Sequence, residues 1–231
     1  MGTVWLQHSV PRFIDDVSKG YTYPSNGREN GQLFFCITFP LAAVETISYH
    51  LQVQAANVYQ TRYLPWVEKF PQFSALLKKK YMKKFNDIQV DILLTRKKRP
   101  VLAIAKSPKW MRDIYTEELS RKIEDSMTVQ TWKNGAGGAQ DMYCKGKYTV
   151  TDVQYVSVNT QSGLLQFSSR EDHSKWSVAR TKGVFCFSSL NRMISQWRRG
   201  GEITCLVDIP LAKLFRDSIY KRSKCNANRE K

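Results

Sequence analysis

The pattern of apolar and polar positions predicts strands along most of the chain. Residues 4–10 alternate between the two kinds before Pro11, which is typical of a half-buried strand. Residues 32–39 are mostly apolar and predict a buried strand that is too short to cross a bilayer, so we expect no membrane partner. The other predicted strands lie at 88–95, 101–106, 126–132, 148–158, 164–168, 176–180, 183–188 and 202–207.

Stretches with helical periodicity separate several of these strands. We expect a helix at 40–52, where Pro40 suits the first turn, and another at 65–82, where aromatic and leucine side chains share one side. Further helices are expected at 111–124 and 210–220. Strands interleaved with helices indicate an α/β fold in which helices cover a mixed sheet.

The chain is strongly basic, which points to an anionic partner. It holds 36 Lys and Arg against 20 Asp and Glu, a net charge of +16 over 231 residues. An excess of this size, when it is clustered, favours a polyanion, although composition does not separate DNA from RNA, acidic sugars or acidic lipid. The clusters are at 78–80, 83–84, 96–99, 198–199 and 221–222.

The five cysteines are widely spaced and show no metal-finger pattern. Such cysteines suit disulfides in an oxidising compartment, and the odd count leaves one thiol without a partner within the chain. We expect no metal site. The glycine-rich stretch 134–139 lacks the lysine and spacing of a phosphate-binding loop, so we also expect no nucleotide or other small-molecule cofactor.

One of the three histidines stands in His-x-Lys spacing, at His173 and Lys175. Side chains two apart in an extended segment share a face, so an imidazole and an ammonium can hold one phosphate together. Such an imidazole can attack phosphorus or donate a proton. Glu171 lies on the same face and is a candidate to orient the ring. By spacing alone, however, a chance pair on the exposed strand of a basic protein is the better explanation.

Further candidates follow along the chain. Asn191 comes after the next predicted strand and turn, and it offers a neutral hydrogen-bond donor. Lys182 and Arg192 would add positive charge around the same phosphate, and we expect both to contact DNA together with Arg198 and Arg199.

Several stretches together resemble the deoxyribonuclease II family. They are VWLQHSVPRF (4–13), GQLFFCITFP (31–40), EDHSKWSV (171–178), RRGGEITC (198–205) and CNANR (225–229), in family order over nearly the whole chain. The lysine-rich composition resembles divergent members from parasitic roundworms. The resemblance implies a phospholipase D-like fold, in which two α/β halves each give one His-x-Lys motif to a shared site that uses neither metal nor cofactor.

The resemblance also implies roles for individual residues. His173, Lys175 and Asn191 match the catalytic motif, and His8 matches a histidine near the site. One histidine of the pair attacks the phosphate, and the other protonates the leaving 5′ oxygen. The implied disulfides are Cys144–Cys225 and Cys186–Cys205, with Cys36 unpaired or bridged to another chain.

The chain departs from the family pattern because it contains a single His-x-Lys motif. We expect residues 1–86 to be a remnant of the N-terminal half and residues 87–231 to be a complete C-terminal half. Three explanations remain open: a piece of a longer enzyme, a homodimer in which each copy gives one motif, and an inactive form that still holds DNA.

Two functions follow from this reading. The first is a metal-independent acid endonuclease that hydrolyses DNA through a phosphohistidine and leaves 3′-phosphate ends, with a second His-x-Lys supplied in trans. The alternative is a catalytically inactive, secreted DNA-binding or host-interaction protein on the same scaffold. Either way, we expect DNA and a second copy of the chain as partners, and a secreted or lysosomal location, with the leader outside these residues.

Overall fold

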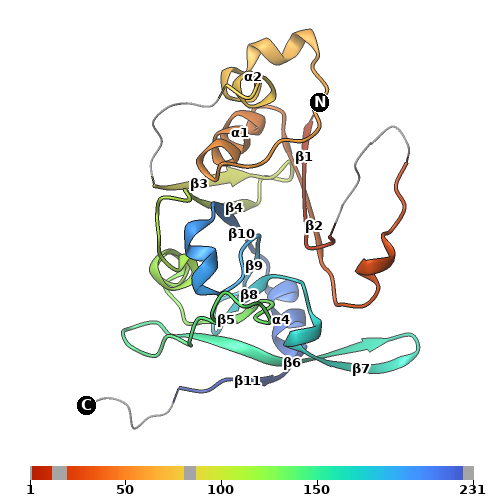
Figure 1. Ribbon diagram of the computed structural model, residues 1–231, viewed down its shortest axis with the longest axis vertical. Helices are drawn as coiled ribbons and strands as arrows, with labels where there is room; N and C mark the ends of the chain where they lie inside the picture. The colour runs from red at the N-terminus through yellow and green to blue at the C-terminus, as the bar shows by residue number, and fades with distance from the viewer. Residues whose placement is uncertain (1, 12–19, 81–86, 226–231) are drawn as a thin grey trace.

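A large mixed sheet forms the body of the protein in the computed structural model, which describes residues 2–11, 20–80 and 87–225 (Figure 1). Within these residues the sheet has nine strands in the order β11-β6-β5-β8-β9-β10-β4-β3, with β7 paired to β6. Only β5 and β6 run parallel in the described sheet. Its strands are β3 (Ile88–Leu94), β4 (Pro100–Lys106), β5 (Met127–Gln130), β6 (Val150–Thr160), β7 (Gly163–Ser168), β8 (Trp176–Ala179), β9 (Val184–Ser188), β10 (Gly201–Val207) and β11 (Ile219–Arg222).

The first part of the chain forms a separate hairpin-like sheet and two helices. β1 (Gly2–His8) pairs antiparallel with β2 (Phe34–Pro40), and β1 carries the alternation that predicted it. β2 was predicted as a buried strand, but its residues alternate between buried and exposed because only one of its faces packs on the core. Helix α1 (Ala43–Val53) packs against β3 and β4, and α2 (Pro71–Leu77) packs against α1 (Figure 1). The mixed α/β architecture is therefore confirmed and is consistent with a phospholipase D-like fold.

The helix predicted at 65–82 is wrong as one continuous element. Residues Pro65–Lys69 form a 3₁₀ helix, and α2 starts anew at Pro71. Pro71 lacks an amide hydrogen and disfavours helical geometry at Phe70, so the chain turns there. The aromatic side still assembles, because the Trp66 ring lies 6.1 Å from that of Phe70 and 6.2 Å from that of Phe73. Residues 81 and 82 lie outside the described part.

The helix predicted at 111–124 is shorter and irregular. A π-helical turn at Tyr115–Leu119 continues into α3 (Ser120–Ile123), and Glu124 ends it in the left-handed conformation with a φ of 54°. Ile114, Leu119 and Ile123 are buried in the main core, as the apolar spacing predicted.

Two smaller cores attach other elements to the sheet. One joins Trp5, Phe39 and Ile47 to Val101 and Ala103, so the first part of the chain shares its core with β4. The predicted boundary between residues 86 and 87 falls beside the segment 81–86, which lies outside the described residues, and the division into halves stays a prediction.

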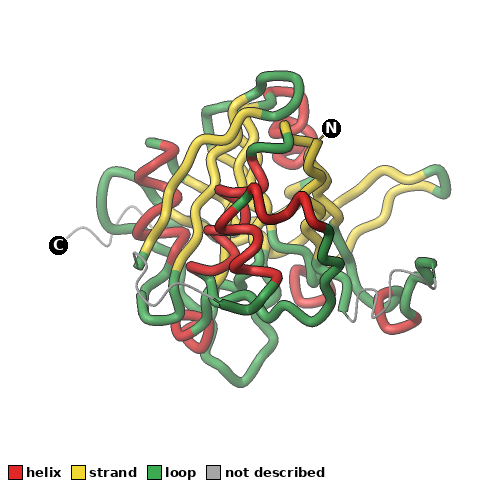
Figure 2. Tube along the Cα trace, turned by 90° about the horizontal axis from the view of Figure 1, so that it is seen from above, coloured by secondary structure: helices red, strands yellow, loops and turns green. Residues whose placement is uncertain are grey.

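The other small core lies under α4 (Ile209–Asp217), which packs against β8, β9 and β11. Phe215 contacts Trp176 and Phe185, with ring centroids 5.0 and 4.2 Å apart. The hairpin of β6 and β7 projects from the body, as the views from the front and from above agree (Figures 1 and 2). α4 thus fixes β8, the strand that follows His173.

The disulfides are the pairs that the family resemblance implied. Cys144 is bonded to Cys225 and ties the segment after β11 to the loop before β6. Cys186 is bonded to Cys205, its partner across the β9–β10 ladder. Cys36 is an exposed free thiol on β2. Among the described helices, none has the length and apolar character needed to cross a membrane.

Candidate active site

His173 lies in an extended link just before β8, and a distant glycine holds this link in place. Gly31 donates its amide to the Glu171 carbonyl at 2.8 Å, and its own carbonyl accepts the His173 amide at 2.9 Å. A Cβ on Gly31 would lie 2.8 Å from Oδ1 of the buried Asp172, so only glycine allows this approach. The pairing brings the start of the 31–40 stretch directly to the candidate site.

The two motif residues face the same way, as the extended spacing predicted. Asp172, Ser174 and Trp176 are buried, whereas His173 and Lys175 between them are half-buried. This alternation has the period of an extended segment, in which neighbouring side chains point to opposite sides. The arrangement leaves the imidazole and the amine on the more open side of the link.

The imidazole of His173 is held by two side chains. The edge of Trp132 packs on it, with ring centroids 4.7 Å apart and an interplanar angle of 66°. Gln32 places its Nε2 3.4 Å from Nδ1 of the ring. Gln32 is held in turn by Ser9, whose hydroxyl donates to Oε1 at 2.7 Å. With Nδ1 engaged in this way, Nε2 is the ring nitrogen left for a phosphate.

The environment keeps the His173 ring neutral at neutral pH. Burial lowers the pKa of His173 from the ordinary value of 6.5, and the nearby Lys175 charge lowers it further. Protonation therefore requires a more acidic solution than for a free imidazole.

Lys175 does not extend into solvent but folds back along the link. Its Nζ donates to the backbone carbonyl of His173 at 2.6 Å. Burial lowers the pKa of Lys175 to about 8, with Asp172 acting to raise it and Arg199 to lower it. The amine therefore remains charged at acidic and neutral pH. Its position fixes a positive charge beside the ring.

The side chain of Asn191 carries a buried acceptor that no described residue satisfies. It follows β9, whose last residue Ser188 donates its amide to the Lys175 carbonyl at 2.9 Å. The Oδ1 of Asn191 is buried and has no hydrogen-bond partner among the described residues. An unpaired buried amide oxygen is costly, which is typical of functional positions.

His8 lies at the end of β1, next to the serine that holds Gln32. Its ring stacks on that of Phe34 with centroids 5.8 Å apart. Burial lowers the pKa of His8, while a hydrogen bond with the Val10 backbone raises it. The connection from His8 to His173 therefore runs through Ser9 and Gln32.

Three of the expected site residues form other contacts in this structure. Glu171 does not orient His173, because its carboxylate accepts the Ser168 amide at 3.0 Å and caps a short 3₁₀ helix, Ser169–Glu171. Lys182 lies in the turn after β8, at the opposite end of that strand from His173, and its Nζ donates to the Ile123 carbonyl at 2.7 Å.

Arg192 is the third of these residues, and its side chain is buried away from solvent. It is 1% exposed and forms ion pairs with Asp152 at 2.6 Å and Asp113 at 3.3 Å. By contrast, Arg198 and Arg199 are exposed at the end of a 3₁₀ helix, Ile194–Arg198, and Arg199 is near enough to influence Lys175.

The comparison with known sequences identifies the family. A sequence profile described as deoxyribonuclease II matches residues 1–225, which is most of the chain. The chain belongs to the deoxyribonuclease II family. Its place in that family agrees with the resemblance of the short motifs and with the mixed α/β fold.

Curated relatives of deoxyribonuclease II align with almost the whole chain. Plancitoxin-1 of Acanthaster planci is 32% identical over 225 residues, which are 96% of this chain and 62% of the relative. Deoxyribonuclease-2-alpha of Mus musculus is 31% identical and covers 97% of this chain and 64% of its own length. Deoxyribonuclease-2 of Caenorhabditis elegans is 31% identical, with 92% and 56% covered. The chain thus spans less than two thirds of the length of these relatives.

Sequence reasoning missed two residues that contact the candidate deoxyribonuclease II site, Gln32 and Trp132. Gln32 lies 141 positions from His173 in the chain, and Trp132 follows the short strand β5. Neither stands in a motif with the histidine, so no local pattern indicated them. Among the described residues, no group of three or more His, Cys, Asp or Glu side chains could hold a metal ion.

Proposed function

We propose that the chain is a metal-independent acid endonuclease that hydrolyses DNA phosphodiesters and leaves 3′-phosphate ends. Membership of the deoxyribonuclease II family supports DNA as the substrate class. The observation that carries the proposal is the shared open side of His173 and Lys175, with Nδ1 of the ring held by Gln32. A charged amine beside an oriented imidazole suits attack on a phosphodiester.

The proposed reaction has two steps. A neutral imidazole attacks phosphorus through Nε2, the bond from phosphorus to the 5′ oxygen breaks, and a protonated second imidazole gives its proton to that oxygen. Water then attacks the phosphohistidine, gives a proton back to the second imidazole, and releases the 3′-phosphate. Lys175 stabilises the charge on the phosphoryl oxygens, and Asn191 adds a neutral donor.

The carboxamide of Gln32 can pair with either neutral tautomer of the His173 ring. As placed, its Nε2 donates to an unprotonated Nδ1. Turned over, its Oε1 accepts a proton from Nδ1, which is the tautomer that frees Nε2 for attack, and the Ser9 hydroxyl then accepts instead of donating. A carboxylate at this position would accept from Nδ1–H in the neutral or the protonated ring and would raise the pKa of the ring.

The second imidazole must come from outside the single motif of this chain, and we propose that a second copy supplies it. A symmetric pair would place two identical His-x-Lys motifs around one phosphate, one ring neutral and the other protonated. The lowered pKa of His173 then moves the pH at which both forms coexist below 6.5. We also propose a secreted or lysosomal compartment, which the two disulfides suit.

Plasmid cleavage in the presence of EDTA tests the proposal. The wild-type protein should nick the plasmid at acidic pH, and His173→Ala should lower the rate by roughly ten-thousand-fold or more. Lys175→Ala should lower it by about a hundredfold or more. Lys97→Ala, an exposed lysine on the β3–β4 turn, is the matched control and should cleave normally. An intact plasmid across the acidic and neutral range would reject catalysis by this chain.

The alternative is an inactive protein that binds DNA or a host partner on the same scaffold. The net charge of +16 and the single motif favour it. Binding would then be to backbone phosphates, would weaken steeply with salt, and would survive His173→Ala. Affinity for DNA that stays constant as the salt concentration rises would remove this alternative.

A further inference from the structure

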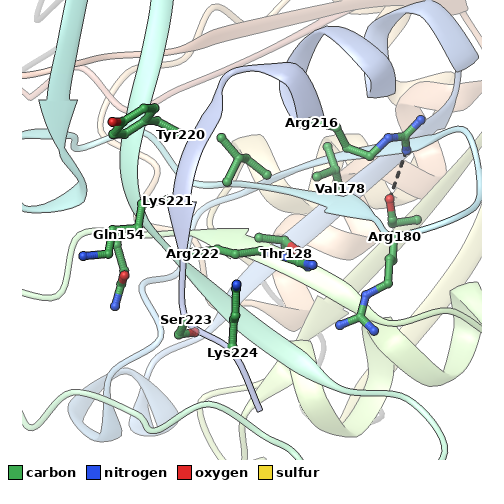
Figure 3. A pocket seen from close by; sticks show the side chains of 12 residues that line it. Thr128, Gln154, Val178, Arg180, Arg216, Tyr220, Lys221, Arg222, Ser223 and Lys224 are labelled. Atoms are coloured by element: carbon green, nitrogen blue, oxygen red, sulfur yellow. Dashed lines mark hydrogen bonds between the residues drawn. The ribbon is translucent and has the colours of Figure 1, made fainter. Parts of the chain in front are cut away.

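A basic hollow lies at the opposite end of β8 from His173. It has a volume of about 690 Å³ and is formed by β5, β6, β8, α4 and β11 (Figure 3). No acidic side chain is among the described residues that line it. Its basic residues are Arg180, Arg216, Lys221, Arg222 and Lys224.

The three guanidinium groups of the hollow are held by neutral acceptors. Arg216 donates through Nη1 to the Ala179 carbonyl at 3.0 Å and to that of Lys182 at 2.9 Å. Arg222 donates to Thr128 Oγ1 at 3.3 Å, and these two side chains lie in the middle of the hollow in Figure 3.

Arg180 follows the same pattern, since its Nη2 donates to Thr149 Oγ1 at 3.2 Å. In the described part of the chain, none of Arg180, Arg216 and Arg222 forms an ion pair. Their positions are therefore fixed by neutral oxygens while their charges remain uncompensated. This pre-organisation favours an anion with several oxygen acceptors, because a guanidinium binds such a group through two hydrogen bonds.

We propose that this hollow is a second binding site for the phosphodiester backbone of DNA, separate from the site at His173. Three fixed guanidinium groups and two exposed lysines match consecutive phosphates better than a single small anion. The choice of DNA over another phosphate-bearing polymer rests on the proposed function.

The hollow is too far from His173 to bind the reacting phosphate. Arg180 follows His173 by seven residues along an extended path that includes β8, or roughly 20 Å at about 3.3 Å per residue. That separation equals about six base pairs of duplex at 3.4 Å each. A duplex would therefore have to be longer than this separation to contact both sites, whereas a shorter fragment can contact only one.

Fluorescence anisotropy with a labelled duplex of about twelve base pairs, twice that separation, tests the proposal. The measurements use the full chain carrying His173→Ala, so that the probe is not cleaved. Adding Arg180→Ala and Arg222→Ala should weaken binding at least tenfold and reduce the salt slope by about 1.8, for two lost phosphate contacts. The matched control is Arg96→Ala with Lys97→Ala, which removes the same charge from the β3–β4 turn at the other end of the sheet.

If the arginine substitutions reduce the affinity for DNA only as much as the control does, the proposal is overturned, because net charge alone would then explain the binding. The double substitution Lys221→Ala and Lys224→Ala replaces two exposed residues, so it should leave the folded structure intact. It should still weaken DNA binding by more than the control does. Weaker binding to phosphatidylserine vesicles with unchanged binding to DNA would also overturn it.

The proposal of a second binding site and the proposed nuclease function can be rejected independently of each other. Cleavage by the wild-type protein with no effect of the arginine substitutions on binding removes the second site and keeps the enzyme. Lost binding in the arginine variant, together with a wild-type protein that does not cleave, keeps the second site and removes the enzyme.

Discussion

Gln32 links the candidate nucleophile to the first strands of the chain through one side chain. Its carboxamide lies between the Ser9 hydroxyl and Nδ1 of His173, so it controls the ring orientation and responds to the ring's protonation. A residue that hydrogen-bonds to a catalytic side chain acts by orienting that side chain and not by contact with the substrate. Gln32 is therefore a positioning residue in the proposed reaction.

Substitution of Gln32 should change the titration of His173. Gln32→Glu places a carboxylate at Nδ1 and raises the pKa of the ring, so the neutral form is lost at a higher pH. Gln32→Ala should lower kcat by roughly tenfold or more, with a smaller change in KM. NMR titration of the His173 ring measures the first effect whether or not the chain is active. Gln161→Ala, in the exposed β6–β7 turn, is the control, and an unchanged ring pKa in Gln32→Glu would contradict the assignment.

Arg192 is a structural residue, which gives a prediction about stability. Arg192→Met leaves Asp113 and Asp152 without their shared cation, so the free energy of unfolding should fall by about 3–5 kcal/mol in urea titrations. The salt dependence of DNA binding should stay unchanged in the folded variant. Arg198→Ala, at an exposed position, should show the reverse: near-normal stability and a salt slope lower by about 0.9. A stable Arg192→Met with a reduced slope would return Arg192 to the DNA surface.

Elements far apart in the chain meet at Glu202 on β10. Its carboxylate accepts Nε2 of Gln7 from β1 at 2.6 Å and Nε2 of Gln54, just after α1, at 2.9 Å. The chain just before Glu202 also packs closely on Gln54, since a Cβ on Gly200 would lie 1.8 Å from the Gln54 carbonyl oxygen. The stretch RRGGEITC is thus the place where the first part of the chain docks on the main sheet.

Glu202 should make the fold more stable in acid. Burial raises its pKa above the unfolded value of 4.5, while hydrogen bonds from Gln54 and Gln7 oppose the shift. The stability that the proton provides is complete below pH 4.5 and is lost as the pH rises through the raised pKa. Glu202→Gln should therefore flatten the fall of unfolding free energy from acid to neutral pH. Glu124→Gln, an exposed carboxylate, is the control; the same slope in wild type and Glu202→Gln would refute the assignment.

Local patterns predicted most elements, and their failures have physical causes. Pro71 divided a helix that apolar spacing alone made continuous. The helix predicted at 210–220 ends at Asp217, and the strand β11 was missed because its first residues, from Ile219, were assigned to that helix. His173, Lys175 and Asn191 were proposed from the sequence because their types match the family motif, and their roles stay a prediction. Gln32 and Trp132 were not, because their contact with the ring depends on how distant segments pack.

The whole molecule separates its reactive and its basic features along one strand. His173 precedes β8 and the basic hollow lies at the other end of the strand, so under our two proposals only a duplex longer than this separation could contact both. The apolar core of β1, β2 and α1 is shared with β4, so the first part of the chain packs against the main sheet.

A homodimer with one motif from each copy gives a prediction for mixtures. If His173→Ala subunits exchange freely with wild type in equal amounts, only pairs of two wild-type copies are active, and the rate per total protein should fall to about a quarter. Light scattering should show a dimer in both samples, and Lys97→Ala subunits should cause no loss. A fall to one half would instead show that each chain acts alone.

The sequence by itself determined most of the strands, the basic character and, through family resemblance, the disulfide pairs, because periodicity, charge and short motifs can be read along the chain without its fold. Only the tertiary structure decided that Arg192 is buried, that Glu171 caps a turn, and that Gln32 holds His173. It also gathered arginines from β11, α4 and the end of β8 into one hollow. The burial and the hydrogen-bond partners of these side chains depend on which distant segments pack together, and the local sequence does not contain that information.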